Sequence, residues 1–311
     1  MTHVRLRIGT RGSTLALAQT DETRRRLAAA HAELAAANAI ESVVIRTTGD
    51  KVLDRPLAEV GGKGMFTKEI DEALLSEAVD VAVHSVKDLP TRLPDGLVLG
   101  AVLPREDPRD VLVWSTVGGL DALPAGATIG TVSLRRQAQV LNRRPDIWVV
   151  PMRGNVGTRL AKLRPGHIDA TLLALAGLRR LGLTEVTATV VEPEEMLPAV
   201  GQGAIGIVCR TGDEKTRTWL AALDHGPSHA RVRAERAMLG VLDGSCRTPI
   251  AGLAEAVPAG LWLRGLVASP DGIHVVTADR EGSSADSEAM GTDLGHELRR
   301  RAGPNLLSFQ G

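Results

Sequence analysis

Cys246 is the first residue whose type and position could carry chemistry. It lies in "DGSCRTPIAG", after the helix-like run "HARVRAERAMLGVL", and is one of two cysteines in 311 residues. Asp243 and Gly244 favour a turn there, and Pro249 prevents a following helix. A lone cysteine is more often a small buried hydrophobe than a reactive thiol. The stretch alone leaves a structural and a reactive role open.

A second candidate is "HSVKDLP", at the end of the apolar run "VDVAV". Ligands of open α/β sheets bind at the carboxyl ends of strands. Asp88, close to Lys87, has a carboxylate that can stabilise a developing cation and transfer protons. The alternative is that Asp88 caps the turn before Pro90. His84 is interpreted as a structural residue.

Arginine supplies a third pattern, because 31 of the 37 basic residues are arginine and only six are lysine. Genomic base composition can explain this bias, but a guanidinium also binds carboxylates through two parallel hydrogen bonds. Four of these arginines fall at predicted strand-to-helix turns, and a fifth lies one turn into a helix: Arg11, Arg135, Arg136, Arg153 and Arg159. Together they predict a cleft for a ligand with several carboxylates.

The elements that must position these residues alternate between strand and helix, which is typical of an α/β fold. Strands are predicted at 4–10, 42–49 and 79–86, with a helix over 13–37 and another helix that carries Phe66, Ile70 and Leu74 on one face. "RIGTRGS" and "TIGTVS" suggest two similar units, with Ser13 and Ser133 as helix N-caps. From about residue 225, a hairpin with a Pro-Asp-Gly turn and a following helix predict a small α+β domain.

Composition excludes several classes of protein. Two cysteines cannot form a disulfide framework, which predicts a reducing, cytoplasmic location. The N-terminus "MTHVRLRIGT" lacks the apolar core of a signal peptide, and no apolar run reaches membrane-spanning length. Zero net charge and 2% aromatic residues argue against nucleic-acid binding. No cluster has metal-ligand spacing, and Cys209 is interpreted as an inert strand residue.

The motifs together resemble the porphobilinogen deaminase (hydroxymethylbilane synthase) family from about residue 5 to 290. The resemblance lies in "IGTRGSTLALAQT", "VGGKGMFTKEID", "AVHSVKDLPT", "REDPRD", "SLRRQAQ", "RGNVGTRL", "AVGQGAIG" and "AERAMLG…GSCRTPIAG". It implies two α/β domains like periplasmic binding proteins, over 1–103 with 200–222 and over 104–199. It also implies a smaller α+β domain over 223–311.

The resemblance further implies a monomeric transferase that joins four porphobilinogen units head to tail, with loss of ammonia, and releases hydroxymethylbilane by hydrolysis. Cys246 would carry a dipyrromethane cofactor through a thioether, and Arg247 would favour its thiolate. Asp88 would act on the pyrrole nitrogens. The cofactor-binding residues would be Lys87, Asp88, Ser133, Arg135, Arg136, Arg153 and Arg159. The substrate-binding residues would be Arg11, Ser13, Arg153, Arg159 and Arg180. Asp50, Lys63 and Phe66 would belong to a loop over the cleft, with no metal ion.

A different class remains as the alternative, namely a two-domain anion-binding protein without catalysis, in which Cys246 is structural. The absence of an export signal in the sequence argues against it.

Overall fold

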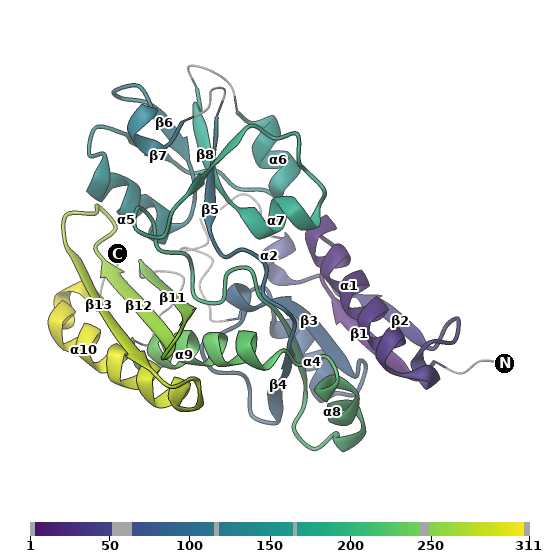
Figure 1. Ribbon diagram of the computed structural model, residues 1–311. Helices are drawn as coiled ribbons and strands as arrows, with labels where there is room; N and C mark the ends of the chain where they lie inside the picture. Colours follow the sequence, from purple (N-terminus) through teal and green to yellow (C-terminus); the bar gives the residue numbers. More distant parts are fainter. Residues whose placement is uncertain (1–3, 52–63, 115–117, 164–166, 243–248, 308–311) are drawn as a thin grey trace. The chain divides into compact units, whose positions relative to one another are not determined.

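The computed structural model describes residues 4–51, 64–114, 118–163, 167–242 and 249–307, and the chain divides into two units (Figure 1). The first unit takes residues up to 53, 61–106 and 204–229. The second takes 54–60, 107–203 and 230–311. Each unit is built around a five-stranded sheet of described residues, and the second also holds a three-stranded sheet.

The sheet of the first unit has the order β2-β1-β3-β10-β4. Strands β1 (Leu6–Thr10), β2 (Ile40–Val44) and β3 (Val81–Ser85) are parallel, whereas β10 (Ile205–Arg210) runs antiparallel to β3 and to β4 (Leu97–Val102). Alternating side chains of β3 divide between two core clusters. Val81 and Val83 pack with Leu27 of α1 (Thr14–Ala30), while Ala82 packs with Ile70 of α4 (Lys68–Leu75). Packing on both faces holds β3 in place, and with it the position of its carboxyl end at Ser85.

The five-stranded sheet of the second unit repeats that arrangement, with the order β7-β6-β8-β5-β9. Strands β6 (Thr128–Gly130), β7 (Trp148–Val150) and β8 (Ala170–Ala174) are parallel. Strand β5 (Asp110–Trp114) is antiparallel to β8 and to β9 (Ala188–Val191). Helices α5 (Leu134–Arg143), α6 (Val156–Ala161) and α7 (Leu175–Arg180) follow β6, β7 and β8. The prediction of two similar α/β units is confirmed.

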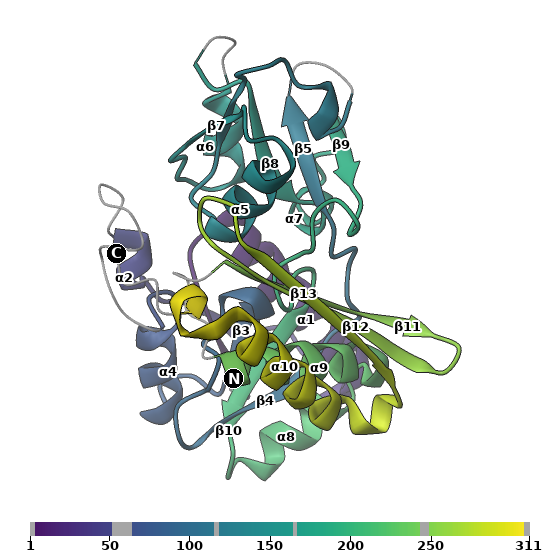
Figure 2. The ribbon, with the colours of Figure 1, turned by 90° about the vertical axis from the view of Figure 1, so that its left-hand side faces the viewer.

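The C-terminal part is a three-stranded antiparallel sheet with helices, as an α+β domain requires. Its strands are β11 (Ile250–Val257), β12 (Gly260–Ala268) and β13 (Val275–Gly282). Helix α10 (Ser287–Leu307) lies along β12 and β13 (Figure 2). The predicted hairpin is β12–β13, and the sequence did not reveal β11, the strand that begins four residues after Cys246. The fold class is therefore confirmed, and the division into three domains stays a prediction.

Two predicted elements were wrong in extent. Helix α1 ends at Ala30 and not at residue 37, because His31 is extended (φ −133°, ψ 112°) and its Nε2 lies 2.9 Å from the Trp219 carbonyl oxygen. Trp219 belongs to α8 (Glu214–Ala221), so a tertiary contact overrides the helix propensity of the alanines. The predicted strand at 42–49 ends at Val44, and Thr48–Lys51 form the helical turn α2.

Helices α9 (Gly226–Leu242) and α10 pack closely because α10 presents glycine at the contact. A Cβ atom on Gly291 would lie 2.1 Å from the carbonyl oxygen of Ala234, and one on Gly295 would lie 2.8 Å from that of Met238. Larger side chains on α10, including Leu294 and Leu298, complete the core with α9. No helix within the described ranges is long and apolar enough to cross a membrane.

Gly291→Ala should destabilise the protein by about 1–3 kcal/mol, because the added methyl group meets backbone and not a side chain that can rotate away. Urea unfolding measures the loss. Gly226→Ala is the matched control, since a Cβ atom there meets nothing within 4 Å, and its stability should change by less than about 0.5 kcal/mol. Equal unfolding midpoints for Gly291→Ala and wild type would show that the helix contact tolerates a side chain.

Candidate functional site

Asp88 and Lys87 lie in a 3-10 turn, Val86–Asp88, that directly follows the buried strand β3. Val86 is buried and anchors the turn, while Lys87 and Asp88 are exposed. No hydrogen bond or ion pair joins the Asp88 carboxylate to another described residue, so it does not cap the turn through a hydrogen bond. The strand is therefore followed at its carboxyl end by an exposed carboxylate, where it can meet a ligand.

His84, four residues earlier, is only 5% exposed. Its Nε2 atom has no hydrogen-bond partner among the described residues. Burial lowers the pKa of His84 to about 4, and the positive charge of Arg11 acts in the same direction. The imidazole is consequently neutral at neutral pH, and its burial agrees with the structural role expected of it.

Arg11, Asp50 and Phe66 form one cluster in the first unit. The Arg11 Nε atom donates to Asp50 Oδ1 at 3.2 Å, and its guanidinium carbon lies 4.3 Å from the centroid of the Phe66 ring. Asp50 also accepts a hydrogen bond from the Thr47 hydroxyl at 2.8 Å. Burial tends to raise the pKa of Asp50, but the hydrogen bonds and the charge of Arg11 outweigh it and hold that pKa below its usual value. Asp50 thus stays ionised and fixes the guanidinium over the ring.

Ser13 and Ser133 are the N-caps of α1 and α5, as their position after a strand predicts. The Ser13 hydroxyl accepts from the Ala16 amide at 3.3 Å, and the Ser133 hydroxyl accepts from the Arg136 amide at 3.4 Å. A hydroxyl that accepts in a cap still has its own proton to donate. Both serines can therefore add a donor to an anion bound near the helix start.

Arg135 and Arg136, on the first turn of α5, are 6% and 5% exposed and share a buried carboxylate. Arg135 Nη1 donates to Asp110 Oδ2 at 2.7 Å, and Arg136 Nη2 donates to Asp110 Oδ1 at 2.7 Å. Burial tends to raise the pKa of Asp110, but the two guanidinium groups outweigh it and hold that pKa well below its usual value. The three residues form an ionised cluster in the interior of the second unit.

The remaining predicted arginines lie on neighbouring turns of the same unit. Arg153 is half-buried before α6, and Lys162 Nζ donates to its carbonyl oxygen at 3.0 Å. Arg159, in α6, donates from Nε to the Gly154 carbonyl at 2.9 Å. Arg180, at the end of α7, donates from Nη2 to the Gly203 carbonyl at 2.8 Å. Arg153 and Arg159 follow β7, and Arg180 follows β8. Because β7 and β8 belong to one sheet, the three arginines lie on segments that follow strands of the same sheet.

Two predicted residues, Cys246 and Lys63, lie outside the described residues. Helix α9 ends at Leu242 and β11 begins at Ile250, and these two elements bracket the segment with Cys246. The other cysteine, Cys209, is fully buried in β10, and burial raises the pKa of its thiol to about 11. A thiol of that kind is unreactive at neutral pH, as expected.

Asp110 and Gln202 are the residues that sequence reasoning missed. Asp110 is the last residue of "REDPRD", and Gln202 belongs to "PAVGQGAIG", the two crossing segments in which the chain passes from one unit to the other. Both motifs carry the family resemblance, but no site residue was predicted in either. Gln202 Nε2 donates to Asp110 Oδ1 at 3.0 Å and to the Pro108 carbonyl at 2.7 Å. The sequence signal that could have pointed to Asp110 is a carboxylate at the start of a strand, in a unit that is rich in arginine.

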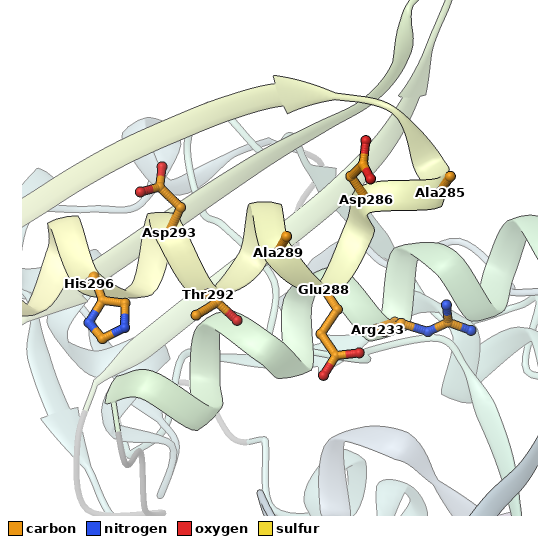
Figure 3. Close-up of a pocket in the computed structure, with 8 residues that line it drawn as sticks. All are labelled: Arg233, Ala285, Asp286, Glu288, Ala289, Thr292, Asp293 and His296. Carbon is orange, nitrogen blue, oxygen red and sulfur yellow. The ribbon is translucent and has the colours of Figure 1, made fainter.

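A pocket lies elsewhere, between α9 and the start of α10 (Figure 3). Arg233 reaches it from α9, and the other side chains come from α10 and the turn before it. It contains none of the predicted site residues. Among the described residues, no group of histidine, cysteine, aspartate and glutamate could hold a metal ion.

Comparison with known proteins assigns a family to nearly the whole chain. Residues 6–218 match the family model "Porphobilinogen deaminase, dipyromethane cofactor binding domain", and residues 229–300 match "Porphobilinogen deaminase, C-terminal domain". The chain is 57% identical over 304 residues to porphobilinogen deaminase of Paracoccus denitrificans, covering 98% of this chain and 96% of that protein. It is 54% identical over 306 residues to the chloroplastic enzyme of Oryza sativa, covering 97% of this chain and 85% of that protein.

Two solved binding proteins resemble the chain at low sequence identity. The methionine-binding protein MetQ superimposes with a TM-score of 0.44 at 12% identity, covering 70% of this chain and 89% of that one. The probable amino-acid transporter binding protein YtmK of Bacillus subtilis gives a TM-score of 0.42 at 12% identity, covering 71% and 91%. No argument rests on these two structures. The family models and the sequence relatives show that the chain belongs to the porphobilinogen deaminase family.

Proposed function

We propose that this protein joins four porphobilinogen molecules head to tail on a dipyrromethane primer and releases hydroxymethylbilane by hydrolysis. The observation that carries the proposal is the Asp88 carboxylate, which is exposed at the end of a buried parallel strand and bonds to no other described residue. A carboxylate in that state has its acceptor sites open to a ligand. The family to which the chain belongs supplies the substrate and the cofactor.

The residues of the second unit fit a dipyrromethane. This group bears acetate and propionate side chains, so it needs several cationic donors, and Arg135 and Arg136 offer N–H groups not used by Asp110. The Ser133 hydroxyl, on the same helix start, can donate as well. When bound, the dipyrromethane supplies the pyrrole end to which further units are added.

Cys246 would hold this group covalently through a thioether. The neighbouring Arg247 would favour the thiolate form of the cysteine, which is the form that makes such a bond. Burial raises the pKa of the Cys209 thiol to about 11, so Cys209 stays protonated at neutral pH and is not suited to attachment.

Asp88 would act next to the pyrrole nitrogens of the substrate. Loss of ammonia from an aminomethylpyrrole leaves the ring electron-poor, and a fixed carboxylate lowers the free energy of the positive charge that develops. The same carboxylate can accept and return a proton. Lys87, its neighbour, offers a cation for the acidic side chains of the substrate.

The other predicted residues would hold carboxylates. Arginine suits this role because its planar fork donates two hydrogen bonds to one carboxylate. In the first unit, Asp50 and Phe66 keep the Arg11 guanidinium in place. The proposed carboxylate-binding set is Arg11, Ser13, Lys87, Ser133, Arg135, Arg136, Arg153, Arg159 and Arg180. Lys63 would join Asp50 and Phe66 in the loop near the site.

The proposed setting is a cytoplasmic monomer that takes a small-molecule substrate and binds neither nucleic acid nor membrane. Two cysteines without a disulfide framework support a reducing compartment. Zero net charge supports the absence of a polyanionic partner.

Cys246→Ser should give folded protein without bound dipyrromethane and without activity. Intact mass under denaturing conditions measures this directly: wild type should exceed its sequence mass by one dipyrromethane, and the variant should not. Cys209→Ser is the matched control and should keep the added mass. Active wild-type protein with the mass of the bare chain would exclude a covalent tether. A red colour with an acidic aldehyde reagent for pyrroles, retained after denaturation, gives an independent readout.

Asp88→Asn should slow turnover by roughly 10²–10⁴-fold, the range for a positioned acid–base group. The fall should lie mainly in kcat, because the amide keeps the size of the side chain and loses its charge. Steady-state kinetics on protein with dipyrromethane loading verified by mass makes the measurement. Asp95→Asn is the control, since Asp95 is an exposed carboxylate of the same unit, and it should turn over like wild type. Full activity of loaded Asp88→Asn would remove Asp88 from the chemistry.

A further inference from the structure

Asp110 stands at the centre of a charged cluster that is closed to solvent. It is the first residue of β5, has 0% exposure, and pairs across the sheet with Ala174 of β8 and Val191 of β9. Its Oδ1 accepts from Arg136 Nη2 at 2.7 Å, from Arg136 Nε at 3.2 Å and from Gln202 Nε2 at 3.0 Å. Its Oδ2 accepts from Arg135 Nη1 at 2.7 Å. The carboxylate is thus fully engaged by three side chains.

These contacts fix the two guanidinium groups from different directions. Arg136 presents its Nε edge to one carboxylate oxygen, which sets the plane of its fork. Arg135 uses Nη1 both for Asp110 and for the Leu197 carbonyl, at 2.7 Å each. Gln139 Nε2 donates to the same Leu197 carbonyl at 3.1 Å, so the acceptor is itself held. Each arginine therefore has one defined orientation before any ligand arrives.

The cluster carries one positive charge that no carboxylate balances. Two guanidinium groups face a single carboxylate, and within the described residues neither arginine has a second ion-pair partner. Burial lowers the pKa of Arg135, the Asp110 charge opposes that shift, and the charge of Arg136 adds to it. Arg135 Nε and Nη2 and Arg136 Nη1 make no hydrogen bond to a described residue. An unbalanced buried charge is costly, and an anion relieves that cost.

We infer that Asp110 is a positioning residue that orients Arg135 and Arg136 and limits their anion-binding capacity to one carboxylate. The inference rests on the proposed function, because the carboxylate in question is one of those of the dipyrromethane. Without Asp110, the pair would hold two positive charges and no common acceptor. It would then attract small anions more strongly, yet it would no longer present the geometry that the dipyrromethane needs.

Two substitutions, made singly and together, vary the net charge of the cluster. Asp110→Asn raises it to two, Arg136→Gln lowers it to zero, and the double variant returns it to one. Inorganic sulfate is the probe, titrated against the thermal unfolding midpoint of the full chain in a Cys246→Ser background, which has no dipyrromethane. Sulfate affinity should follow the charge: about tenfold tighter for Asp110→Asn than for the parent, about tenfold weaker for Arg136→Gln, and near the parent for the double variant.

Dipyrromethane loading, read by denatured mass in chains that retain Cys246, tests the orientation. Loading of Asp110→Asn should fall at least tenfold although its sulfate affinity rises, a combination that simple loss of stability does not produce. Asp121→Asn is the matched control, because Asp121 pairs with Arg143 in the same unit at an exposed position, and both readouts should equal those of the parent.

Unchanged sulfate affinity in Asp110→Asn, or full loading of that variant, would overturn the inference. If Asp110→Asn does not fold, Arg136→Gln and the double variant decide it, since equal sulfate affinity in those two would also overturn it. If wild type itself gains no mass, the covalent tether fails, while the sulfate series still reports on Asp110.

Discussion

The Asp110 carboxylate, buried between two arginines and a glutamine, is the interaction on which the second unit depends. Removing three charges from water costs several kcal/mol per ion, and only close pairing with further hydrogen bonds returns that free energy. Arg135 and Arg136 come from the first turn of α5, Gln202 comes from the crossing segment, and Asp110 opens β5. One carboxylate therefore ties a helix start, a strand start and a connecting segment together, and the same contacts fix the orientation of two guanidinium groups.

The first unit treats its charged groups differently. Arg11 and Asp50 are partly exposed and pair with each other, with 22% and 27% of their side chains accessible. Asp88 is exposed and has no partner within the described part of the chain, because the turn after β3 points its polar residues away from the core while Val86 anchors it. The buried carboxylate of Asp110 thus has its acceptor sites filled by neighbouring side chains, whereas the exposed carboxylate of Asp88 has its acceptor sites open. Asp110 and Asp88 are the same residue type, and they differ in the environment that the fold gives each of them.

Both five-stranded sheets place their polar residues by the same local device. In each, Gly-Thr stands at the strand end, with the threonine as the last residue of β1 and as the residue directly after β6. A serine caps the following helix, and arginine lies within three residues of that cap: Arg11 beside Ser13, Arg135 and Arg136 beside Ser133. The free amides and the dipole of a helix start favour an anion at that point. The repeated strand order shows that this is one structural solution used twice, which explains why the short similarity between "RIGTRGS" and "TIGTVS" was meaningful.

The sequence by itself determined the elements whose signals are local. Apolar runs predicted β1, β3 and β6, Ser13 and Ser133 predicted their helix starts, and the Pro-Asp-Gly turn predicted the β12–β13 hairpin. Ordered motifs along nearly the whole chain also identified the family, and with it Cys246 and Asp88. The predictions of these strands, helix starts and hairpin are confirmed because backbone preference and hydrophobic period depend on neighbours within a few residues, whereas the roles of Cys246 and Asp88 stay predictions.

Only the tertiary structure decided how the charges are paired. It ended α1 at His31 through a contact with Trp219, added β11 beside the hairpin, and brought Asp110 to Arg135 and Arg136 from a sequence distance of 25 and 26 residues. Such pairings leave no local signal, because "REDPRD" has the same composition whether its last aspartate faces water or the interior. An ion pair depends on which side chains the fold removes from water together, and that is a property of the packed sheet rather than of any segment of the chain.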